Sequence, residues 1–453
     1  MDKETIEKVL RIWNPHFENI DKIYGQSTIP RTLYLSKLQE LIHLRHILVL
    51  TGIRRAGKTT LMHQLMRWLM KKEKVPPKNI LYLFLEDILI TPYLQHGAKY
   101  LDALLQHYQE SLNPQGKIYL FLDEIQGIPD FNRWIASQYE RNPHFKFILS
   151  GSCQSLVKAS TASLLTGRNI QIDIYPFSFS EYLGFKKVPF QTAETPQEIW
   201  QSNFSQSSQI QHYLSRYMLE GGFPEIVLAS NETEKRAIAS SYYHDSVHRD
   251  ILLVHSIRNA RDIELLGLHL FREFTKTHSY SSLGKPFKLS VDTIKNYLSY
   301  YQQAHLFFES PFFSYKSKES QDIQKARKIY TIDSGLRNWN IPQIRPDFGQ
   351  CAENLCFLEL KKTCQSVYYW KGKQEVDFAV FSPTLHLINV SFTDKIPPRE
   401  YSGLREAMES LQLDEGTLIT KNTLQHTTQQ GKTIHQIPLW AWLLATNKSP
   451  SPK

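Results

Sequence analysis

The stretch GIRRAGKTT, from Gly52 to Thr60, has the residue types and the spacing of a phosphate-binding loop. It fits the P-loop pattern G-x-x-x-x-G-K-[ST] at every fixed position. In such a loop the ammonium of Lys58 reaches the β- and γ-phosphates, and the hydroxyl of Thr59 ligates Mg²⁺. The residues predicted to bind the nucleotide are Gly52, Ile53, Arg54, Arg55, Ala56, Gly57, Lys58, Thr59 and Thr60.

The sequence on either side of this loop supplies the elements that would position it. Residues 46–51 (HILVLT) form a short apolar run rich in branched side chains, which predicts a buried parallel strand. After the loop, Leu61, Leu65 and Leu69 recur on one side of a predicted helix. Backbone N–H groups and the positive end of the helix dipole would then face the phosphates. We therefore expect the chain to bind ATP or GTP.

An acidic pair follows the loop at a suitable distance. Residues 117–126 (KIYLFLDEIQ) are an apolar run that ends in Asp123 and Glu124. In P-loop enzymes such a strand places one acid to hold Mg²⁺ through water, here Asp123, and a second to polarise the attacking water, here Glu124. An ordinary strand followed by an acidic turn is the alternative, and the position behind a P-loop disfavours it. Glu124 indicates hydrolysis in addition to binding.

A third predicted strand, residues 145–152 (FKFILSGS), runs into small polar residues. Because strand ends meet the ligand at the carboxyl edge of such a sheet, Ser150 or Ser152 could contact the γ-phosphate or the lytic water. A serine-rich turn without that role stays an open alternative. Further along, SLLTGR offers Arg168 as a cation that acts on a neighbouring subunit's nucleotide, although arginines are plentiful in this chain.

Together these motifs carry a resemblance to a known family. The chain resembles the prokaryotic AAA-type ATP-binding proteins whose ATPase precedes a winged-helix segment and a restriction-endonuclease-like domain. The matching pieces, spread from about residue 29 to 444, are IPRTLYL, GIRRAGKTTL, FLDEIQ, LSGS, SLLTGR, YPFSFSEYL, GGFPE, HRDIL, KIYTIDSGL, YYWKGKQEVDF and IPLWAWLL. The resemblance implies an ATP-hydrolysing AAA+ protein that uses ATP and Mg²⁺ and assembles into a ring, with a hexamer expected. It also implies an active-site role for Arg168, with Arg249 of HRDIL as a second candidate.

The expected fold class is α/β, because residues 46–185 alternate strands and helices as a parallel sheet does. We predict a P-loop AAA+ core followed by a helical lid, a winged helix-turn-helix and a PD-(D/E)XK nuclease-like α/β domain. The polar composition of residues 184–211 predicts an exposed loop or linker. The predicted segments are 1–45 (helical), 46–185 (ATPase core), 186–255 (lid), 256–340 (winged helix-turn-helix), 341–447 (degenerate endonuclease-like domain) and 448–453 (tail).

Residues 256–333 read as a small helical domain with a β-wing. Ser290 is a suitable N-cap for a helix that starts at Val291, whose buried stripe would be Val291, Ile294, Tyr297 and Leu298. This helix stands in the recognition position of a winged helix-turn-helix, although such domains also mediate protein contacts. The residues predicted to contact DNA are Lys295, Asn296, Lys316, Lys318, Lys325 and Arg327.

The C-terminal part departs from an active nuclease. Nucleases of this type need a metal-binding Asp followed by Glu-x-Lys on the neighbouring strand. Asp377 and an upstream Glu353 are present, but the Glu-x-Lys position reads Asn389-Val390-Ser391. Asn is a weaker ligand for Mg²⁺ and Ser carries no charge, while Lys395 lies beyond the expected strand. We therefore predict no cleavage, and a role as a scaffold or a nucleic-acid platform.

The amino-acid composition indicates the kind of partner and the cellular compartment to expect. A formal net charge of +9 over 453 residues favours an anionic partner, DNA first. Four irregularly spaced cysteines indicate a reducing cytoplasm and no disulfide framework, and no run of 18 apolar residues suggests a membrane span. The leading interpretation is an AAA+ ATPase that couples hydrolysis to DNA binding, translocation or remodelling. The alternatives are an ATP-driven regulatory switch acting on protein partners and an ATP-dependent nuclease.

Overall fold

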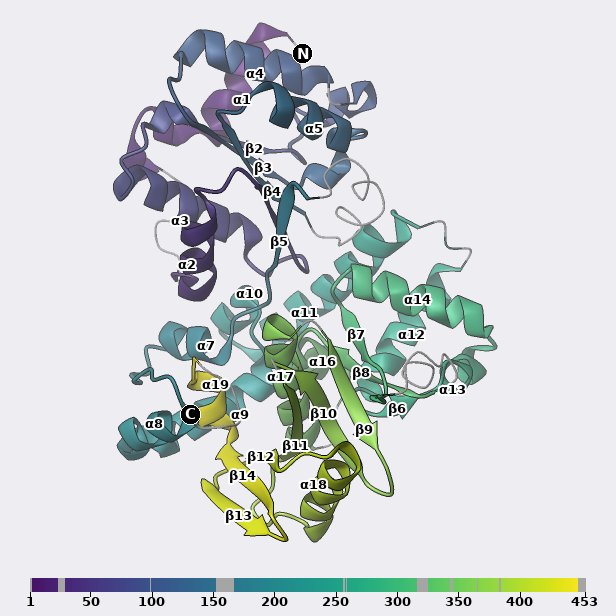
Figure 1. Ribbon diagram of the computed structural model, residues 1–453. Coiled ribbons are helices and arrows are strands. Elements are labelled where there is room, and N and C mark those ends of the chain that lie inside the picture. The colour runs from purple at the N-terminus through teal and green to yellow at the C-terminus, as the bar shows by residue number, and fades with distance from the viewer. Residues whose placement is uncertain are drawn as a thin grey trace. The chain divides into compact units, whose positions relative to one another are not determined.

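The computed structural model describes residues 2–22, 29–97, 99–151, 167–255, 257, 259–315, 325–342, 345–364, 366–382 and 384–446. The chain divides into two compact units, Met1–Tyr175 and Pro176–Lys453, which are treated separately below (Figure 1). No helix in the described ranges combines the length and the apolar character needed to cross a membrane.

The first unit is built on five parallel strands, which confirms the expected α/β core. Their order across the sheet is β2-β3-β4-β1-β5. β4 therefore separates the strand before the P-loop from the strand that carries the acidic pair. The strands are β1 (Ile47–Thr51), β2 (Ile80–Phe84), β3 (Ile118–Asp123), β4 (Phe145–Ser150) and β5 (Asn169–Asp173).

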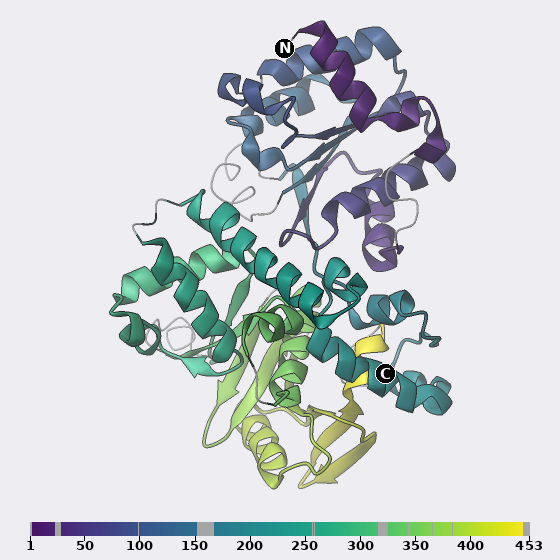
Figure 2. The same ribbon diagram turned by 180° about the vertical axis from the view of Figure 1, so that it is seen from behind.

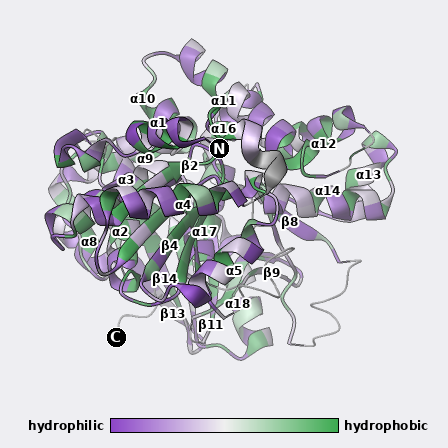
Figure 3. Ribbon diagram, turned by 90° about the horizontal axis from the view of Figure 1, so that it is seen from above, coloured by the Kyte–Doolittle hydropathy of each residue, from purple (hydrophilic) through white to green (hydrophobic). Residues whose placement is uncertain are grey.

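Helices cover both faces of this sheet. Apolar residues of α1, α4 and α5 form one continuous core with one face of β1 to β4. α2 and α3 contact each other, α3 contacts β4, and neither contributes to that core, so they lie on the other face (Figure 1). Hydrophilic and hydrophobic residues alternate along α4 and α5, as two-sided helices require (Figure 3). The helices are α1 (Lys3–Trp13), α2 (Thr32–Leu41), α3 (Lys58–Lys71), α4 (Lys99–Leu112) and α5 (Phe131–Arg141).

The second unit begins with helices. They are α7 (Phe179–Phe185), α8 (Pro196–Ser202), α9 (Ser207–Glu220), α10 (Pro224–Leu228) and α11 (Glu232–Val247), followed by a π-helical turn, His248–Leu252. The predicted exposed loop or linker at 184–211 is right for residues 186–195, which form no helix or strand, and wrong beyond them, because α8 and the start of α9 follow. α8 begins with a capping box between Thr195 and Glu198, and Trp200 stacks on Trp440 with ring centroids 5.4 Å apart.

A small three-stranded sheet follows, with the order β6-β8-β7. In chain order, the strands of this sheet and the helices beside them are α12 (Ala260–Arg272), β6 (Thr277–His278), α13 (Tyr280–Gly284), α14 (Val291–Gln303), β7 (Phe307–Ser310) and β8 (Arg327–Thr331). Ser290 caps α14 as predicted, since its side chain accepts from the backbone N–H of Thr293. Val291, however, is 40% exposed, and Tyr301 takes its place in the buried stripe.

The rest of the second unit surrounds a mixed six-stranded sheet with the order β13-β14-β12-β11-β10-β9. α18 packs on β10, β11 and β12 through a core that includes Leu404, Ala407 and Met408 (Figures 1 and 2). The elements are α16 (Ser334–Asn340), α17 (Phe348–Thr363), β9 (Val367–Lys371), β10 (Glu375–Phe381), β11 (Leu385–Ser391), α18 (Pro398–Leu411), β12 (Glu415–Thr420), β13 (Gln425–Gln429), β14 (Lys432–Pro438) and α19 (Leu439–Leu444). The segments predicted as lid, winged helix and nuclease-like domain thus share one compact unit.

Candidate functional site

The P-loop connects β1 to the N-terminus of α3, and two of its glycines are required by the backbone. Gly57 has φ of 98°, in the left-handed region that other residues avoid. Gly52 has φ of 140°, and a Cβ there would lie 2.2 Å from the carbonyl oxygen of Ile174. The fixed glycines of the motif therefore let the loop turn and let β1 approach the end of β5.

Lys58 is buried at the start of α3. Its ammonium donates to the carbonyl oxygens of Gly52 and Ile53, at 2.9 and 3.2 Å. These contacts place the positive charge within the curve of the P-loop, beside the N-terminus of the helix. A charge in this position can meet phosphate oxygens together with the loop N–H groups.

Arg31, in the IPRTLYL motif, supports the loop from behind and was not predicted as a site residue. Its side chain is buried, and its guanidinium donates to the carbonyl oxygen of Ala56 at 2.6 Å and to that of Tyr175 at 2.8 Å. The backbone N–H of Arg31 also donates to Gln64 on α3, at 3.0 Å. One side chain thus fastens the P-loop to the segment that leaves β5. An unexplained arginine inside an otherwise apolar motif was the only sequence signal.

Asp123, at the end of β3, is buried and accepts three side-chain hydrogen bonds. Thr59 and Tyr82 each donate to Oδ2 at 2.7 Å, and Ser150 donates to Oδ1. Burial, reinforced by the charge of Glu124, raises the pKa of this carboxyl. The two predicted metal ligands, Thr59 and Asp123, are therefore in direct contact. A buried carboxylate joined to a hydroxyl fits the oxygen ligands that Mg²⁺ prefers.

Glu124 follows Asp123 in a left-handed conformation, with φ of 56°. Its backbone N–H donates to Ser150 Oγ at 3.1 Å, and its carboxylate accepts from the side chain of Gln126. A non-glycine residue in this region is strained, and such strain is common at functional sites. Ser150 is thus bonded to both acids from the neighbouring strand β4, whereas Ser152 lies outside the described ranges.

Arg168 lies at the opposite edge of the sheet from the P-loop. It immediately precedes β5, and its carbonyl oxygen accepts from the N–H of Ile47, the first residue of β1. The P-loop begins beyond the other end of β1, roughly 16 Å away for five residues in a strand. The guanidinium pairs with Glu140 at 2.7 Å. Arg168 therefore does not reach the P-loop of the same chain. Arg249, the second arginine candidate, belongs to the second unit and lies 3.7 Å from Asp245.

The residues predicted to contact DNA differ in their solvent exposure and in the contacts that they already make within the protein. Asn296 is exposed, whereas Lys295 is half-buried and lies 3.3 Å from Asp292. Lys325 lies over the ring of Phe312, with its Nζ 3.9 Å from the centroid. The side chain of Arg327 is only 17% exposed, and its Nε lies 3.7 Å from Glu309. This internal ion pair leaves little of its positive charge available to DNA. Lys316 and Lys318 lie outside the described ranges.

The nuclease-like carboxylates surround a lysine that sequence reasoning missed. Lys328, on β8, is 2% exposed, and its ammonium lies 2.8 Å from Glu353, 2.8 Å from Glu375 and 2.7 Å from Asp377. Tyr330 donates to Glu353 at 2.8 Å. Burial and the neighbouring Asp377 raise the pKa of Glu353 to about 8. The cation beside these acids therefore comes from the preceding small sheet, and not from the neighbouring strand or from Lys395.

The predicted Glu-x-Lys position forms one wall of an adjacent hollow of about 490 Å³. Asn389 accepts from the backbone N–H of Asp377 at 3.0 Å and donates to Glu400 at 2.6 Å. Ser391 also lines the hollow. No basic side chain occupies the position that a Glu-x-Lys lysine would fill on β11.

Comparisons with known proteins agree with the first unit. Residues 44–183 match a family described as an AAA domain, and residues 211–345 and 348–442 match two domains of unknown function. The chain is 30% identical to the uncharacterized protein MJ1544 of Methanocaldococcus jannaschii, over 88% of both chains. It is 28% identical to an uncharacterized protein of Haemophilus influenzae, over 78% of this chain and 84% of that protein.

Among solved structures, the Walker-type ATPase paby2304 of Pyrococcus abyssi aligns with a TM-score of 0.40 and 15% identity, over 70% of this chain and 97% of that chain. PCH-2 of C. elegans aligns with a TM-score of 0.26 and 16% identity, over 41% of this chain and 49% of that chain. Neither score is high enough to establish a shared overall fold.

Proposed function

The chain belongs to the family of MJ1544, with a P-loop AAA domain at its N-terminus, and we propose that it hydrolyses ATP and couples hydrolysis to DNA binding and remodelling. The observation that carries the ATPase proposal is the direct contact between Thr59 and Asp123, with Ser150 joining Asp123 to Glu124. A loop that only bound phosphate would not require a second acid held in a strained conformation.

In this proposal each side chain has a separate task. Lys58 neutralises charge on the β- and γ-phosphates, and Thr59 and Asp123 hold Mg²⁺. When bound, Mg²⁺ neutralises charge that develops on the transferred phosphoryl group. Glu124 orients the attacking water and accepts its proton, while Ser150 fixes the relative positions of the two acids.

The position of Arg168 supports the proposal that the chain assembles into a ring. An arginine at the amino edge of the sheet cannot stabilise phosphate charge at the carboxyl edge of the same subunit, but it can do so across a subunit boundary. We therefore propose that Arg168 completes the site of a neighbour, in a ring that we expect to be hexameric.

The DNA proposal rests on the element order around α14. We propose that the helix, the strand, the two helices and the two-stranded wing, with the sheet order β6-β8-β7, form a winged helix-turn-helix. Two exposed lysines, Lys285 and Lys288, occupy the connection between α13 and α14, beside the N-terminus of the proposed recognition helix. Together with Lys295 they offer positive charge to a phosphate backbone, and the neutral amide of Asn296 can donate a hydrogen bond to it.

One observation favours the alternative, a switch that acts on protein partners. Leu253, Val254 and Leu265 are 81%, 51% and 41% exposed, on the connection between α11 and α12 and on α12 itself. Exposed apolar side chains close together in the chain suit a protein contact better than a DNA contact.

The nuclease alternative is disfavoured by Lys328. Its buried ammonium is already paired with Glu353 and Asp377, the acids that would have to bind a metal ion, and Asn389 is hydrogen-bonded to Glu400. We propose that this part of the second unit is a scaffold without cleavage activity.

The rate of ATP hydrolysis with and without duplex and branched DNA tests the proposal. We expect DNA to raise the rate, and reversal of Lys285 and Lys288 to Glu to remove the increase while leaving the basal rate unchanged. Binding should also weaken steeply with salt, because counterions are released on contact. Reversal of Lys187 and Lys373, two exposed lysines elsewhere in the second unit, is the matched control. A rate that no DNA changes would favour the protein-directed switch.

A further inference from the structure

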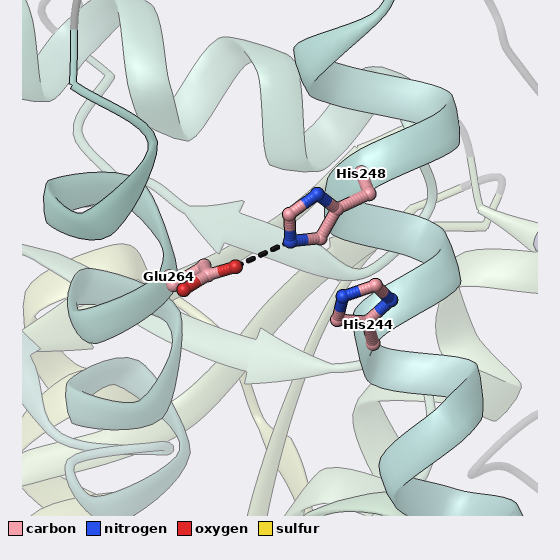
Figure 4. A group of neighbouring side chains, drawn as sticks. All are labelled: His244, His248 and Glu264. Carbon is pink, nitrogen blue, oxygen red and sulfur yellow. Dashed lines mark hydrogen bonds and ion pairs between the residues drawn. The ribbon is translucent and has the colours of Figure 1, made fainter.

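Three side chains with metal-binding atoms meet between α11 and the helix that follows it. His244 and His248 are four residues apart, so they lie on the same face of the helical segment (Figure 4). Glu264 extends toward them from α12 (Figure 4). One nitrogen of each histidine and one oxygen of the glutamate all lie within 4.8 Å of one another.

The three side chains already interact. Nε2 of His248 is hydrogen-bonded to the carboxylate of Glu264. The ring of His244 stacks on that of His248, with centroids 3.9 Å apart and an angle of 18° between the planes. The three groups are partly or fully open to solvent, so an ion can reach them and the rings can adjust around it.

The local backbone adds a second feature. His248 is the first residue of the π-helical turn that ends α11, and π-helical turns are frequently found at functional sites. Arg249, the residue after His248, lies 3.7 Å from Asp245, so its charge is partly compensated. A cation entering between the histidines and Glu264 would gain a carboxylate as well as two imidazole nitrogens.

The donor set selects the kind of ion. Two imidazoles and one carboxylate suit Zn²⁺ and related transition metals, whereas Mg²⁺ prefers oxygen ligands alone. Three protein ligands leave one tetrahedral position open. We propose that His244, His248 and Glu264 form a binding site for one divalent transition-metal ion of the zinc class. The ion would join α11 to α12 and hold the turn that carries Arg249.

Metal titrations of the full chain without nucleotide test this proposal. We expect one Zn²⁺ per chain to bind at this site. Co²⁺ used as a probe should give the visible absorption of a site with imidazole ligands. His244→Ala, His248→Ala and Glu264→Gln should each weaken the dissociation constant for Zn²⁺ by at least about tenfold, since even loss of an outer hydrogen-bond partner costs 10–100-fold at metal sites.

His212→Ala is the matched control, because His212 is exposed in the same unit and lies outside the cluster. It should leave the affinity and the Co²⁺ spectrum unchanged. Zn²⁺ should also raise the melting temperature of the wild type and of His212→Ala, but not that of His248→Ala. Wild-type affinity in His244→Ala and His248→Ala, both shown to be folded, would overturn the proposal. Failure of the wild type to bind micromolar Zn²⁺ would do the same.

Discussion

The ammonium of Lys328 lies 2.7 Å from Oδ1 of Asp377, although the two residues belong to different sheets of the second unit. The same ammonium contacts Glu353 and Glu375. Lys328 is 2% exposed and Glu353 and Asp377 are 14% exposed, whereas Glu375 is 32% exposed. An internal cation thus stands beside Glu353 and Asp377, the two acids that the sequence comparison with nucleases singles out as possible metal ligands. The contact also fastens β8 to α17 and β10.

Lys328→Met should destabilise the second unit strongly. Removing one partner of a buried ion pair costs about 3–5 kcal/mol, because the remaining charges stay without compensation. Mn²⁺ should recover part of this loss in the variant and none in the wild type, since the freed carboxylates can then bind it. Thermal unfolding with and without Mn²⁺ measures both effects. Lys276→Met removes an exposed pair with Glu273 and should change stability by only about 0.5 kcal/mol. An Lys328→Met protein as stable as the wild type would contradict this account.

Arg31→Ala should weaken nucleotide binding, although we expect Arg31 to hold the P-loop and not to contact the nucleotide. The substitution leaves the carbonyl groups of Ala56 and Tyr175 without their charged donor, and such a hydrogen bond contributes about 1.5–3 kcal/mol. We expect at least a tenfold loss of ATP affinity in equilibrium titrations. Arg31→Lys should recover only part of it, because one ammonium cannot bridge both carbonyls as the guanidinium does. The exposed Arg133→Ala serves as the control, and equal affinities of all four proteins would refute the role of Arg31.

Arg168→Ala should lose hydrolysis while its own pocket still binds ATP. Mixed with Lys58→Ala, it should regain partial activity, because some interfaces would then pair an intact pocket with an intact arginine. Glu140→Ala removes the ion-pair partner of Arg168, a carboxylate that also lies 3.9 Å from Arg45, and should retain most of the rate. If subunits exchange and no activity returns, or if Glu140→Ala is equally inactive, Arg168 has a structural role.

Two buried histidines should make the first unit sensitive to acid. Burial lowers the pKa of His16 and of His63 to about 4. The unfolded chain therefore binds more protons than the folded unit below about pH 6.5, so the stability is full above that pH and is lost as the pH falls toward 4. Between pH 7 and pH 5 we expect a loss of about 2 kcal/mol per histidine. Urea unfolding at pH 7 and pH 5 measures this loss of stability, which should be smaller in His63→Gln than in the wild type. An identical loss in the two proteins would argue against the role of His63.

Local patterns predicted the elements that position the nucleotide site. Each of these patterns lies within a short stretch of sequence: the apolar run before Gly52, the leucine spacing after Lys58 and the acids after residue 122. Ser290 was identified as an N-cap for the same reason. The capping box of α8, Thr195 with Glu198, was equally local but was overlooked within a polar stretch.

Long-range contacts could not be predicted in this way. Arg31 meets Ala56 across 25 residues of chain, and Lys328 meets Asp377 across 49. A lone basic residue in an apolar strand or motif gives no indication of its partner. Val291 was assigned to the buried stripe from helical spacing alone, yet the first turn of α14 leaves it exposed and Tyr301 completes the stripe instead.

Steady-state ATP hydrolysis by Glu124→Gln, beside the wild type, tests the central claim most directly. The amide keeps the size of the side chain but cannot accept a proton from water, and loss of such a base costs about 10²–10⁴ in rate. We predict hydrolysis by the wild type and at least a hundredfold lower rate for Glu124→Gln, with ATP binding preserved. Lys58→Ala should abolish tight ATP binding, so its rate is the reference for a protein without bound ATP. A Glu124→Gln protein that hydrolyses ATP at the wild-type rate would contradict the account.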